Sequence, residues 1–447
     1  MASREQFSSK TGFVMAAAGS AIGLGNIWGF PTQTASNGGA AFVLVYFVLA
    51  FCLAYPALMA ELIIGRHARA NIVTALRGIA TGHWSRRLAT MVGCYGVITA
   101  SLILSFYAIV AGWMLAFLLE SISAMLGMAG IAEWLVNFSF ERNILFMGLF
   151  MALTMAIIAK GVSGGIEKWS TRLMPLLLII LIALIVYVLN QQGAAEGLRL
   201  YLLPDFSQIK PSLIIDAMGQ AFFSLSLGVG TMLIYGSYLS KDENLPALGA
   251  AVTVVDASIA FIAGLLIIPA IFVAKQYGVE IFTEGGELVA GPDLIFQVLP
   301  VLFNSMGEVG VWVAFAFFVL MSIASLTSSI SMLEVPVSLA TEETSVNRMQ
   351  ATLVIGALIF LISTVILLNF GDLFGLVIDL TTVYSQPLLG VLLCIFVGWV
   401  WHRNNLLNEI KQGSPDIEGG LFWKIWPAYV KFFCPVLIMA AFIQSIL

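Results

Sequence analysis

Two clusters of glycine interrupt otherwise apolar segments, and these interruptions could bind a ligand. The clusters comprise Gly19, Gly23, Gly25 and Gly29, followed by Pro31, and Gly219, Gly228, Gly230 and Gly236. A glycine inside a helix costs about 1 kcal/mol relative to alanine, so each cluster predicts a broken helix. A broken helix exposes backbone groups to a ligand or ion. Close helix packing of the small-xxx-small type is the alternative explanation.

Residue types that serve enzymes and metal sites are sparse. The four cysteines lie singly in apolar stretches without C-x-x-C spacing, and we expect core thiols at Cys52, Cys94, Cys394 and Cys434. The three histidines lie in polar connections, at His67, His83 and His402. No histidine inside an apolar segment is left to bind a metal or relay a proton. We therefore predict that the protein is not an enzyme.

The composition indicates an all-α integral membrane protein. Of the 447 residues, 60% are apolar and 10% charged, against about 45–50% and 25% in soluble domains. The net charge of -5 includes no basic block, which excludes nucleic-acid binding. We predict eleven transmembrane helices, at about 11–35, 40–65, 89–120, 143–160, 170–190, 211–239, 247–275, 309–340, 349–369, 373–401 and 427–446.

The distribution of Lys and Arg predicts the orientation of the chain. With the N-terminus inside, sixteen basic residues fall in inside loops and four in outside loops. The positive-inside rule then places the N-terminus in the cytoplasm and the C-terminus outside, in a plasma membrane (the inner membrane of a bacterium). The glycine clusters lie in the first and sixth helices. They predict an inverted repeat of residues 1–190 and 211–401, with 427–446 as an added helix.

Three motifs carry a resemblance to a known family. They are GSAIGLGNIWGFP (Gly19 to Pro31) followed by NGGAAF (Asn37 to Phe42), GQAFFSLSLGVG (Gly219 to Gly230) and ASLTSSIS (Ala324 to Ser331). In this order and spacing, the chain resembles the neurotransmitter:sodium symporter family, in the eleven-helix form of its bacterial amino-acid transporters. The resemblance implies a LeuT-like fold with broken helices 1 and 6.

The resemblance implies two sodium sites made of oxygen atoms, which hard cations prefer. The first would use the Ala21 carbonyl with Asn26, Ser224 and Asp256. The second would use backbone carbonyls and two hydroxyls, from Gly19, Ile22, Ala324, Thr327 and Ser328. A Thr-Ser pair alone is weak evidence, because such hydroxyls usually bond back to the preceding turn.

The resemblance also implies an amino-acid site with one subsite for each charge. The amides of Leu24 and Gly25 and the hydroxyl of Tyr107 suit a carboxylate, and the oxygens of Ala21, Phe223, Ser224 and Ser226 suit an ammonium group. Relatives that carry monoamines have Asp where this chain has Gly23. The side-chain subsite would be apolar, which favours a neutral, hydrophobic or aromatic amino acid; its residues would be Ile103, Phe223, Val229, Ser328 and Met332.

The gates of such a transporter are only partly present. Arg4 and Glu342 resemble the inner ion pair, with Tyr238 nearby and Phe7 in place of the usual Trp. At the outer gate, Gly29 replaces an arginine while Asp379 keeps the carboxylate. We expect Asp379 to be solvated, protonated or bonded to another group, for instance Gln33.

Two further carboxylates have predicted roles. Glu61 matches a glutamate that bonds the broken backbone. Asp256 stands where many relatives have Asn, next to residues that match an anion pocket: Tyr46, Gln220 and Ser224. A fixed charge at Asp256 could balance sodium and make chloride unnecessary. The alternative is that Asp256 is protonated and serves only in hydrogen bonding.

We therefore predict a sodium-coupled symporter that imports a neutral amino acid by alternating access without chloride. Its partners would be the amino acid, sodium ions and the lipid bilayer. A membrane enzyme such as a lipid transferase is disfavoured by the placement of the histidines. The remaining alternatives are an amino-acid sensor that binds without transport, suggested by Gly29, and proton coupling through Asp256 or Asp379.

Overall fold

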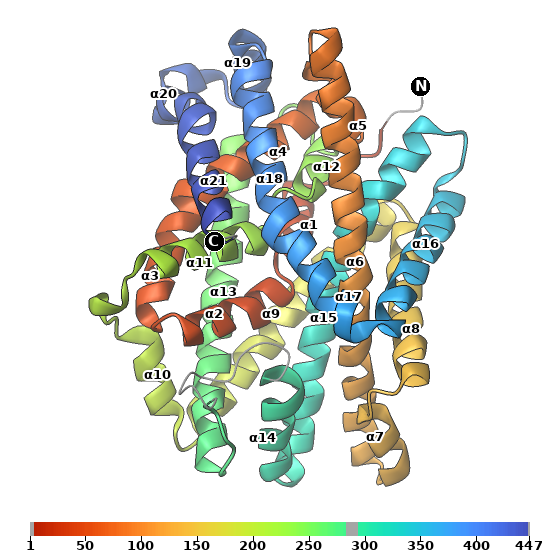
Figure 1. The fold of residues 1–447 in the computed structure, drawn as a ribbon, viewed down its shortest axis with the longest axis vertical. Coiled ribbons are helices and arrows are strands. Elements are labelled where there is room, and N and C mark those ends of the chain that lie inside the picture. Colours follow the sequence, from red (N-terminus) through yellow and green to blue (C-terminus); the bar gives the residue numbers. More distant parts are fainter. Residues whose placement is uncertain (1–3, 283–293, 446–447) are drawn as a thin grey trace.

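The computed structural model describes residues 4–282 and 294–445, and it is a bundle of helices (Figure 1). Helices make up 84% of the described residues, and no strand occurs among them. The predicted all-α fold is confirmed.

The first half of the chain forms thirteen elements, of which the η segments are π-helical turns. They are α1 Lys10–Ala21, η1 Gly25–Gly29, α2 Phe30–Ser36, α3 Ala40–Leu49, η2 Ala50–Ala54, α4 Tyr55–Ala68, α5 Ile72–Ile79, α6 His83–Met125, α7 Ala129–Val136, α8 Phe140–Ile158, η3 Val162–Glu167, α9 Lys168–Leu189 and α10 Ala194–Leu202.

The second half begins with the short 3₁₀ turn η4 Phe206–Gln208. It continues with α11 Pro211–Ser224, α12 Thr231–Ser237, α13 Leu245–Gln276, η5 Leu294–Val298, α14 Leu299–Ser305, α15 Glu308–Glu343, α16 Arg348–Leu368, α17 Phe370–Ile378, η6 Asp379–Ser385, α18 Gln386–Ile395, η7 Phe396–Val400, α19 Arg403–Lys411, η8 Pro415–Gly419, α20 Leu421–Ala428, η9 Tyr429–Phe433 and α21 Cys434–Gln444.

Ten of the eleven predicted membrane-spanning helices have a counterpart among the described residues, and helix 6 does not. Within the described ranges, nine helices are long and apolar enough to cross a membrane, and the bent pair Lys10–Ala21 and Gly25–Ser36 makes ten. The predicted helix 211–239 consists of α11 and α12, each too short to cross alone. The count of eleven and the repeat boundaries therefore stay predictions, and the predicted end at residue 446 lies outside the described residues.

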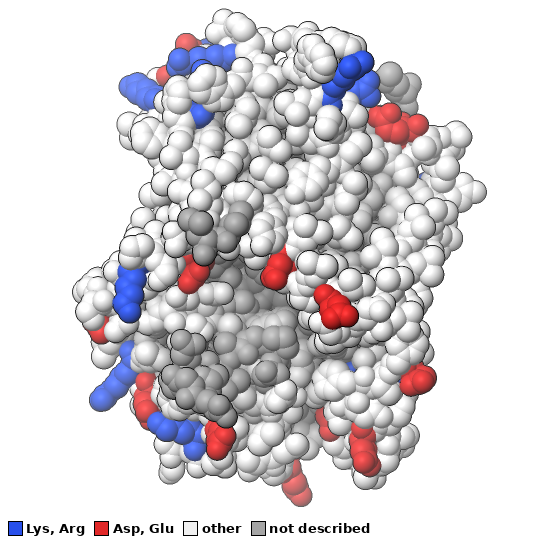
Figure 2. Space-filling view, in the orientation of Figure 1, with Lys and Arg blue, Asp and Glu red and all other residues white. Residues whose placement is uncertain are grey.

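The long helices run mostly along the longest axis of the molecule (Figure 1). The N-terminus, α5, α19 and α20 lie at one end, which we call the N-terminal end, and α7 and α14 lie at the other. Figure 2 shows Lys and Arg at the N-terminal end of this face and again at its lower left, while acidic side chains lie along the upper rim of a recess near its middle. The α1 helix is enclosed by α9, α13 and α15, so it forms part of the centre of the bundle.

The glycine clusters have two different causes. Gly236 packs against α4, because a Cβ atom there would lie 2.7 Å from the carbonyl oxygen of Leu62. Gly228 and Gly230 instead have φ values of +71° and +82°, a backbone conformation that favours glycine. Close helix packing thus explains Gly236, whereas a broken helix explains Gly228 and Gly230.

The prediction that all four cysteines are core thiols is wrong for two of them. Cys394 and Cys434 are buried, but Cys52 and Cys94 are exposed. Lipid-facing and core positions select similar apolar neighbours, so the surrounding sequence could not distinguish the two environments.

Candidate functional site

The first helix breaks after α1. The chain between α1 and η1 is bent by 55°, and Ile22 has an extended ψ of 90°. Gly23 lies in this break against two side chains: a Cβ atom there would lie 2.3 Å from Ser328 Oγ and 2.7 Å from Tyr107 Oη. The break therefore leaves no room for a side chain at residue 23.

The second break lies between α11 and α12, at residues 225–230. Ser226 adopts a left-handed φ of 52° alongside Gly228 and Gly230. The buried carboxylate of Glu61 accepts hydrogen bonds from the Gly228 N–H at 2.7 Å and the Leu233 N–H at 3.3 Å. As predicted, Glu61 takes backbone donors that the broken helix leaves without a partner.

The residues of the first predicted sodium site come together between these breaks. Asn26 Nδ2 donates to Asp256 Oδ1 at 2.8 Å, and Ser224 Oγ donates to the same carboxylate at 3.0 Å. All three side chains are fully buried. Asn26 Oδ1 is buried without a hydrogen-bond partner. Since hard cations bind oxygen, an unpartnered oxygen beside a buried carboxylate fits a cation. Ala21, the fourth predicted member, is the last residue of α1.

The residues of the second predicted site join α1 to α15. Ser328 Oγ donates to the carbonyl oxygens of Gly19 at 3.3 Å and Ser20 at 3.1 Å. Thr327 Oγ1 instead donates to the carbonyls of Ile323 and Ala324 in its own helix, both at 3.1 Å. Ile22 is buried directly after α1, and its N–H donates to Ala18. This group contains neutral oxygens only.

A cavity opens next to both groups and is lined by ten of the eleven predicted substrate residues. These ten are Ala21, Leu24, Gly25, Ile103, Tyr107, Phe223, Ser226, Val229, Ser328 and Met332. Ser224 is absent from the lining because its side chain turns to Asp256. The lining thus combines two helix breaks with apolar walls from α6 and α15.

Some polar groups of this cavity are already engaged. The Leu24 N–H donates to Tyr107 Oη at 3.3 Å. Two groups of the expected carboxylate subsite are therefore already hydrogen-bonded to each other. Ser226 Oγ donates to the carbonyl of Ser20 at 3.1 Å. A ligand that enters must therefore share or replace these bonds.

Four lining residues were not among the predicted substrate residues: Ser20, Gly23, Thr231 and Gln386. Ser20 and Gly23 adjoin predicted residues and Thr231 lies two residues after Val229, so their neighbours along the chain gave the available signal. Gln386 is different, because it comes from α18, more than 50 residues after Met332. The only signal was an uncharged polar side chain before Pro387 in an apolar stretch.

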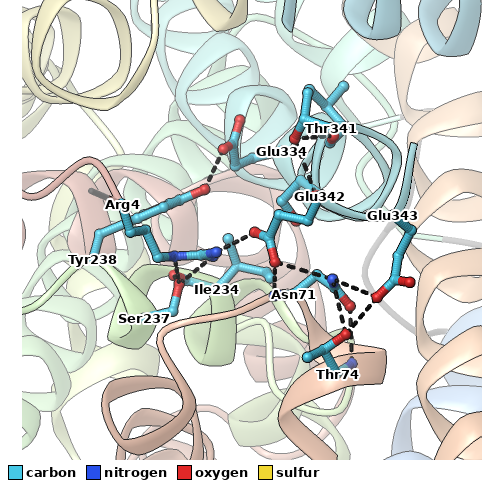
Figure 3. A network of polar contacts seen from close by, with 12 residues as sticks. Arg4, Asn71, Thr74, Ile234, Ser237, Tyr238, Glu334, Thr341, Glu342 and Glu343 are labelled. Atoms are coloured by element: carbon cyan, nitrogen blue, oxygen red, sulfur yellow. Dashed lines mark hydrogen bonds and ion pairs between the residues drawn. The ribbon is translucent and has the colours of Figure 1, made fainter. Parts of the chain in front are cut away.

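The predicted inner gate forms an extended polar network (Figure 3). Arg4 pairs with Glu342 and donates to Ser237 Oγ at 2.7 Å, and its guanidinium lies 4.7 Å from the centre of the Tyr238 ring. Glu342 also accepts from the N–H of Asn71 at 2.7 Å. The structure thus joins Arg4, Glu342 and Tyr238 at the N-terminal end of the cavity.

A second ion pair, on the buried carboxylate of Glu334, extends this network and was not predicted. Tyr238 Oη donates to Glu334 Oε1, and the other oxygen of Glu334 pairs with Arg348, each at 2.5 Å. Glu334 is fully buried. Arg348 also donates to the carbonyl of Ile158 at 2.7 Å. The network therefore ties α12, α15, α16 and α8 together.

A third charged group lies at the same end and joins α4 to α19. Arg66 Nε lies 2.8 Å from Glu409 Oε1, and both side chains are almost fully buried. His67 Nδ1 lies 3.1 Å from Glu409 Oε2. Burial by itself raises the pKa of Glu409, but the hydrogen bond with His67 and the charge of Arg66 outweigh it, so this pKa lies below its ordinary value.

On the other side of the cavity, the described residues form no comparable pair. Asp379 is exposed, and no hydrogen bond or ion pair joins its side chain to another residue of the described chain. Gln33 Oε1 accepts from Asn37 at 3.0 Å, and the described part of the chain contains no bond between Gln33 and Asp379, one of the three expected states of that carboxylate. A Cβ atom at Gly29 would lie 3.2 Å from Gln220 Oε1. Solvation is the predicted state of Asp379 that agrees with its exposure.

Comparisons with known proteins match nearly the whole chain to one family of sodium-dependent transporters. The family model of the sodium:neurotransmitter symporter family matches residues 4–143 and 137–447. The sodium-dependent transporter YhdH of Bacillus subtilis (strain 168) is 34% identical, over 99% of this chain and 97% of its own. A sodium-dependent transporter of Haemophilus influenzae is 33% identical, over 99% and 98%. The crystal structure of MhsT in complex with L-phenylalanine superposes with a TM-score of 0.85 at 36% identity, over 99% and 100%.

Proposed function

Because the chain belongs to the sodium:neurotransmitter symporter family, we propose that it couples sodium entry to the uptake of a neutral, hydrophobic or aromatic amino acid. Members of this family are secondary transporters of the membrane, and they use sodium. The observation that carries the proposal is the cavity between two broken helices, next to a buried carboxylate and the unpartnered oxygen of Asn26. Alternating access around such a midplane site needs no covalent chemistry.

Two sodium ions are proposed to enter with the substrate as its co-transported ions. Asn26, Ser224 and Asp256, with the Ala21 carbonyl, would bind one of them. The carbonyls of Gly19, Ile22 and Ala324, with the hydroxyls of Thr327 and Ser328, would bind the other. The first group borders the substrate cavity at Ala21, so the ion and the amino acid would raise each other's affinity.

The substrate proposal rests on charge and shape at the cavity. Gly23 leaves no space for an acidic side chain. The negative charge that such a side chain supplies in monoamine carriers must therefore come with the substrate, as its own carboxylate. The walls from Ile103, Phe223, Val229 and Met332 are apolar, and burying a charged side chain there would cost several kcal/mol. The similar protein MhsT holds L-phenylalanine, which fits this class.

Transport is proposed to need no chloride. Tyr46 Oη lies 3.1 Å from Ser224 Oγ and 3.4 Å from Asp256 Oδ2, so the Asp256 carboxylate contacts two of the residues that match the anion pocket of relatives. A fixed negative charge there balances sodium without a second ion. Gln220 Nε2 donates to the Gly25 carbonyl at 2.7 Å and is thus engaged with helix 1.

The gates and the orientation complete the proposal. Arg4, Tyr238 and Glu342 would close the cytoplasmic side, and Asp379 would lie on the outer side. The N-terminus would be cytoplasmic and the C-terminus outside, in a plasma membrane such as the bacterial inner membrane. The segments 1–190 and 211–401 are proposed to be the two inverted repeats, with 427–446 as the added helix.

Uptake into proteoliposomes tests the proposal directly. Labelled Leu, Trp and Gly are offered in sodium gluconate or potassium gluconate, with otherwise equal salt on both sides. We expect sodium-dependent accumulation without chloride, greater for Leu or Trp than for Gly. Equal uptake in potassium would refute the sodium sites. Sodium-dependent binding without uptake would instead indicate an amino-acid sensor.

The variant Asp256→Asn tests the charge argument. It removes the fixed charge but keeps the shape, so we expect sodium-driven uptake in gluconate to fall by at least about 10-fold, as loss of about 1.4 kcal/mol of ion binding implies. Added chloride should restore part of it. The matched control Asp205→Asn lies outside the site, on an exposed turn. An unchanged sodium and chloride profile of Asp256→Asn would contradict the proposal.

A further inference from the structure

Gln386 brings an unexpected polar group to the substrate cavity. It is the first residue of α18, directly after the π-helical turn η6. It lines the cavity together with residues of both helix breaks. It is only 3% exposed, so water at the protein surface does not satisfy its amide.

One half of this amide is bonded and the other is not. Gln386 Nε2 donates to the carbonyl oxygen of Leu227 at 3.2 Å. A carbonyl oxygen can only accept, so this contact fixes which end of the amide is the nitrogen. Gln386 Oε1 is buried with no hydrogen-bond partner. A buried acceptor without a donor is unfavourable, so this oxygen favours a bound molecule that brings one.

The position of Gln386 is fixed by close backbone packing. A Cβ atom on Gly228 would lie 2.2 Å from the backbone oxygen of Gln386, so the start of α18 rests directly on the break of helix 6. In the same break, the hydroxyl of Thr231 donates to the carbonyl of Ser226 at 3.1 Å. That hydroxyl proton is therefore already used and does not satisfy Gln386.

The remaining surroundings decide which donor fits. The proposed carboxylate subsite is built from helix 1 and Tyr107, whereas Gln386 belongs to the wall formed by α18 and the break of helix 6. The walls from Ile103, Phe223, Val229 and Met332 are apolar. A side chain that suits them is an apolar ring with a single donor. The indole ring has one N–H donor and no acceptor, so it leaves no new polar group unpaired.

We propose that Gln386 Oε1 accepts a hydrogen bond from the side chain of the substrate, and that the preferred substrates are aromatic amino acids with a ring N–H, with tryptophan as the probe. This inference rests on the proposed function and narrows its substrate class. It makes Gln386 a specificity-determining residue at the side-chain end of the cavity.

A pair of ligands that differ in one atom tests the hydrogen bond in the native protein. L-tryptophan is compared with 3-benzothienyl-L-alanine, in which sulfur replaces the indole N–H, by sodium-dependent binding to the purified full-length protein. We expect tryptophan to bind about 10- to 100-fold more tightly, the range for an unmade buried hydrogen bond. A purely apolar wall would instead favour the sulfur analogue, which is the less polar of the two.

The variant Gln386→Leu assigns this preference to one residue. It replaces the amide by an apolar group of similar size, so the preference for tryptophan should disappear while the sulfur analogue binds equally or more tightly. Gln191→Leu is the matched control, because Gln191 also donates to a backbone carbonyl but follows α9 outside the cavity. That control should keep the native preference.

The outcomes separate this inference from the proposed function. Equal or weaker binding of tryptophan by the native protein overturns the hydrogen bond, even if sodium-dependent binding of other amino acids persists. A preference unchanged in Gln386→Leu overturns the assignment to Gln386. If the native protein binds no amino acid in a sodium-dependent way, the proposed function fails as well. The native comparison decides the matter even where Gln386→Leu does not fold.

Discussion

The two sides of the substrate cavity differ in how their charges are paired. At the N-terminal end, Arg4 pairs with Glu342, and Glu334 pairs with Arg348. Farther out at this end, Arg66 pairs with Glu409. On the other side, the exposed side chain of Asp379 has no partner among the described residues, and Gly29 supplies no side chain.

This difference indicates how the two sides can open. A partly exposed ion pair is worth only about 0–1 kcal/mol, so the Arg4 pair, with side chains 14% and 29% exposed, can break during each transport cycle. A buried pair costs several kcal/mol to break. We therefore expect Arg66 and Glu409 to hold the scaffold, Arg4 and Glu342 to act as the gate, and Asp379 to contribute little to closure.

The largest effect on stability is expected from Glu409→Gln. Removing this carboxylate leaves Arg66 buried with an unpaired charge, which costs about 3–5 kcal/mol. Thermal unfolding in detergent at pH 7 measures the loss. The control Glu196→Gln breaks an exposed pair with Lys275 and should cost at most about 1 kcal/mol. Equal unfolding temperatures for the two variants would contradict the scaffold role.

The same variant has an expected pH dependence. The pKa of Glu409 is lowered in the folded protein, so its contribution is complete above the ordinary glutamate pKa of about 4.3. That contribution is lost as the pH falls through the lowered value. The difference in unfolding temperature between native protein and Glu409→Gln should therefore shrink on acidification from pH 7. A constant difference would show that packing, not charge, is responsible.

An intermediate effect is expected from Arg4→Ala. It should change how often the N-terminal end opens, and it should not change the free energy of unfolding. This change removes the Glu342 pair and the bond to Ser237, and we expect opening at the N-terminal end to increase about 5- to 30-fold, which corresponds to one or two kcal/mol. The readout is the alkylation rate of Ser338→Cys in a chain without its four native cysteines. Ser338 is 2% exposed and lies one helical turn from both Glu334 and Glu342.

Lys10→Ala is the control for this measurement. Lys10 also pairs with a carboxylate at this end, that of Glu243, but its side chain is 69% exposed. Its loss should leave the alkylation rate nearly unchanged. If Arg4→Ala behaves in the same way as Lys10→Ala, the Arg4 pair does not control access.

The smallest effect is expected from Asp379→Asn on the other side of the cavity. An exposed carboxylate without a partner contributes within about 0.5 kcal/mol, so sodium-driven uptake should stay within about twofold of the native rate. Glu342→Gln, which weakens the gate pair, is the matched comparison. A loss from Asp379→Asn as large as that from Glu342→Gln would show that both sides close through charge.

Local features of the sequence predicted much of the fold and of the cavity. Gly228 and Gly230 signal the break of helix 6 because few other residues tolerate a positive φ. The motifs around Asn26, Ser224 and Thr327 supplied seven of the ten predicted residues that line the cavity, all but Ile103, Tyr107 and Met332. The exposure of Cys52 could not be predicted, because lipid and protein neighbours select the same apolar sequence.

By itself, the sequence determined the membrane class, the positions of most helices and the two breaks, since composition, length and glycine content act within one segment of chain. Only the tertiary structure decided which distant side chains meet. It brought Gln386 to the cavity, Glu334 to Arg348 and Glu409 to Arg66. Such contacts depend on how helices pack against one another, and no periodicity within a single helix encodes its partner.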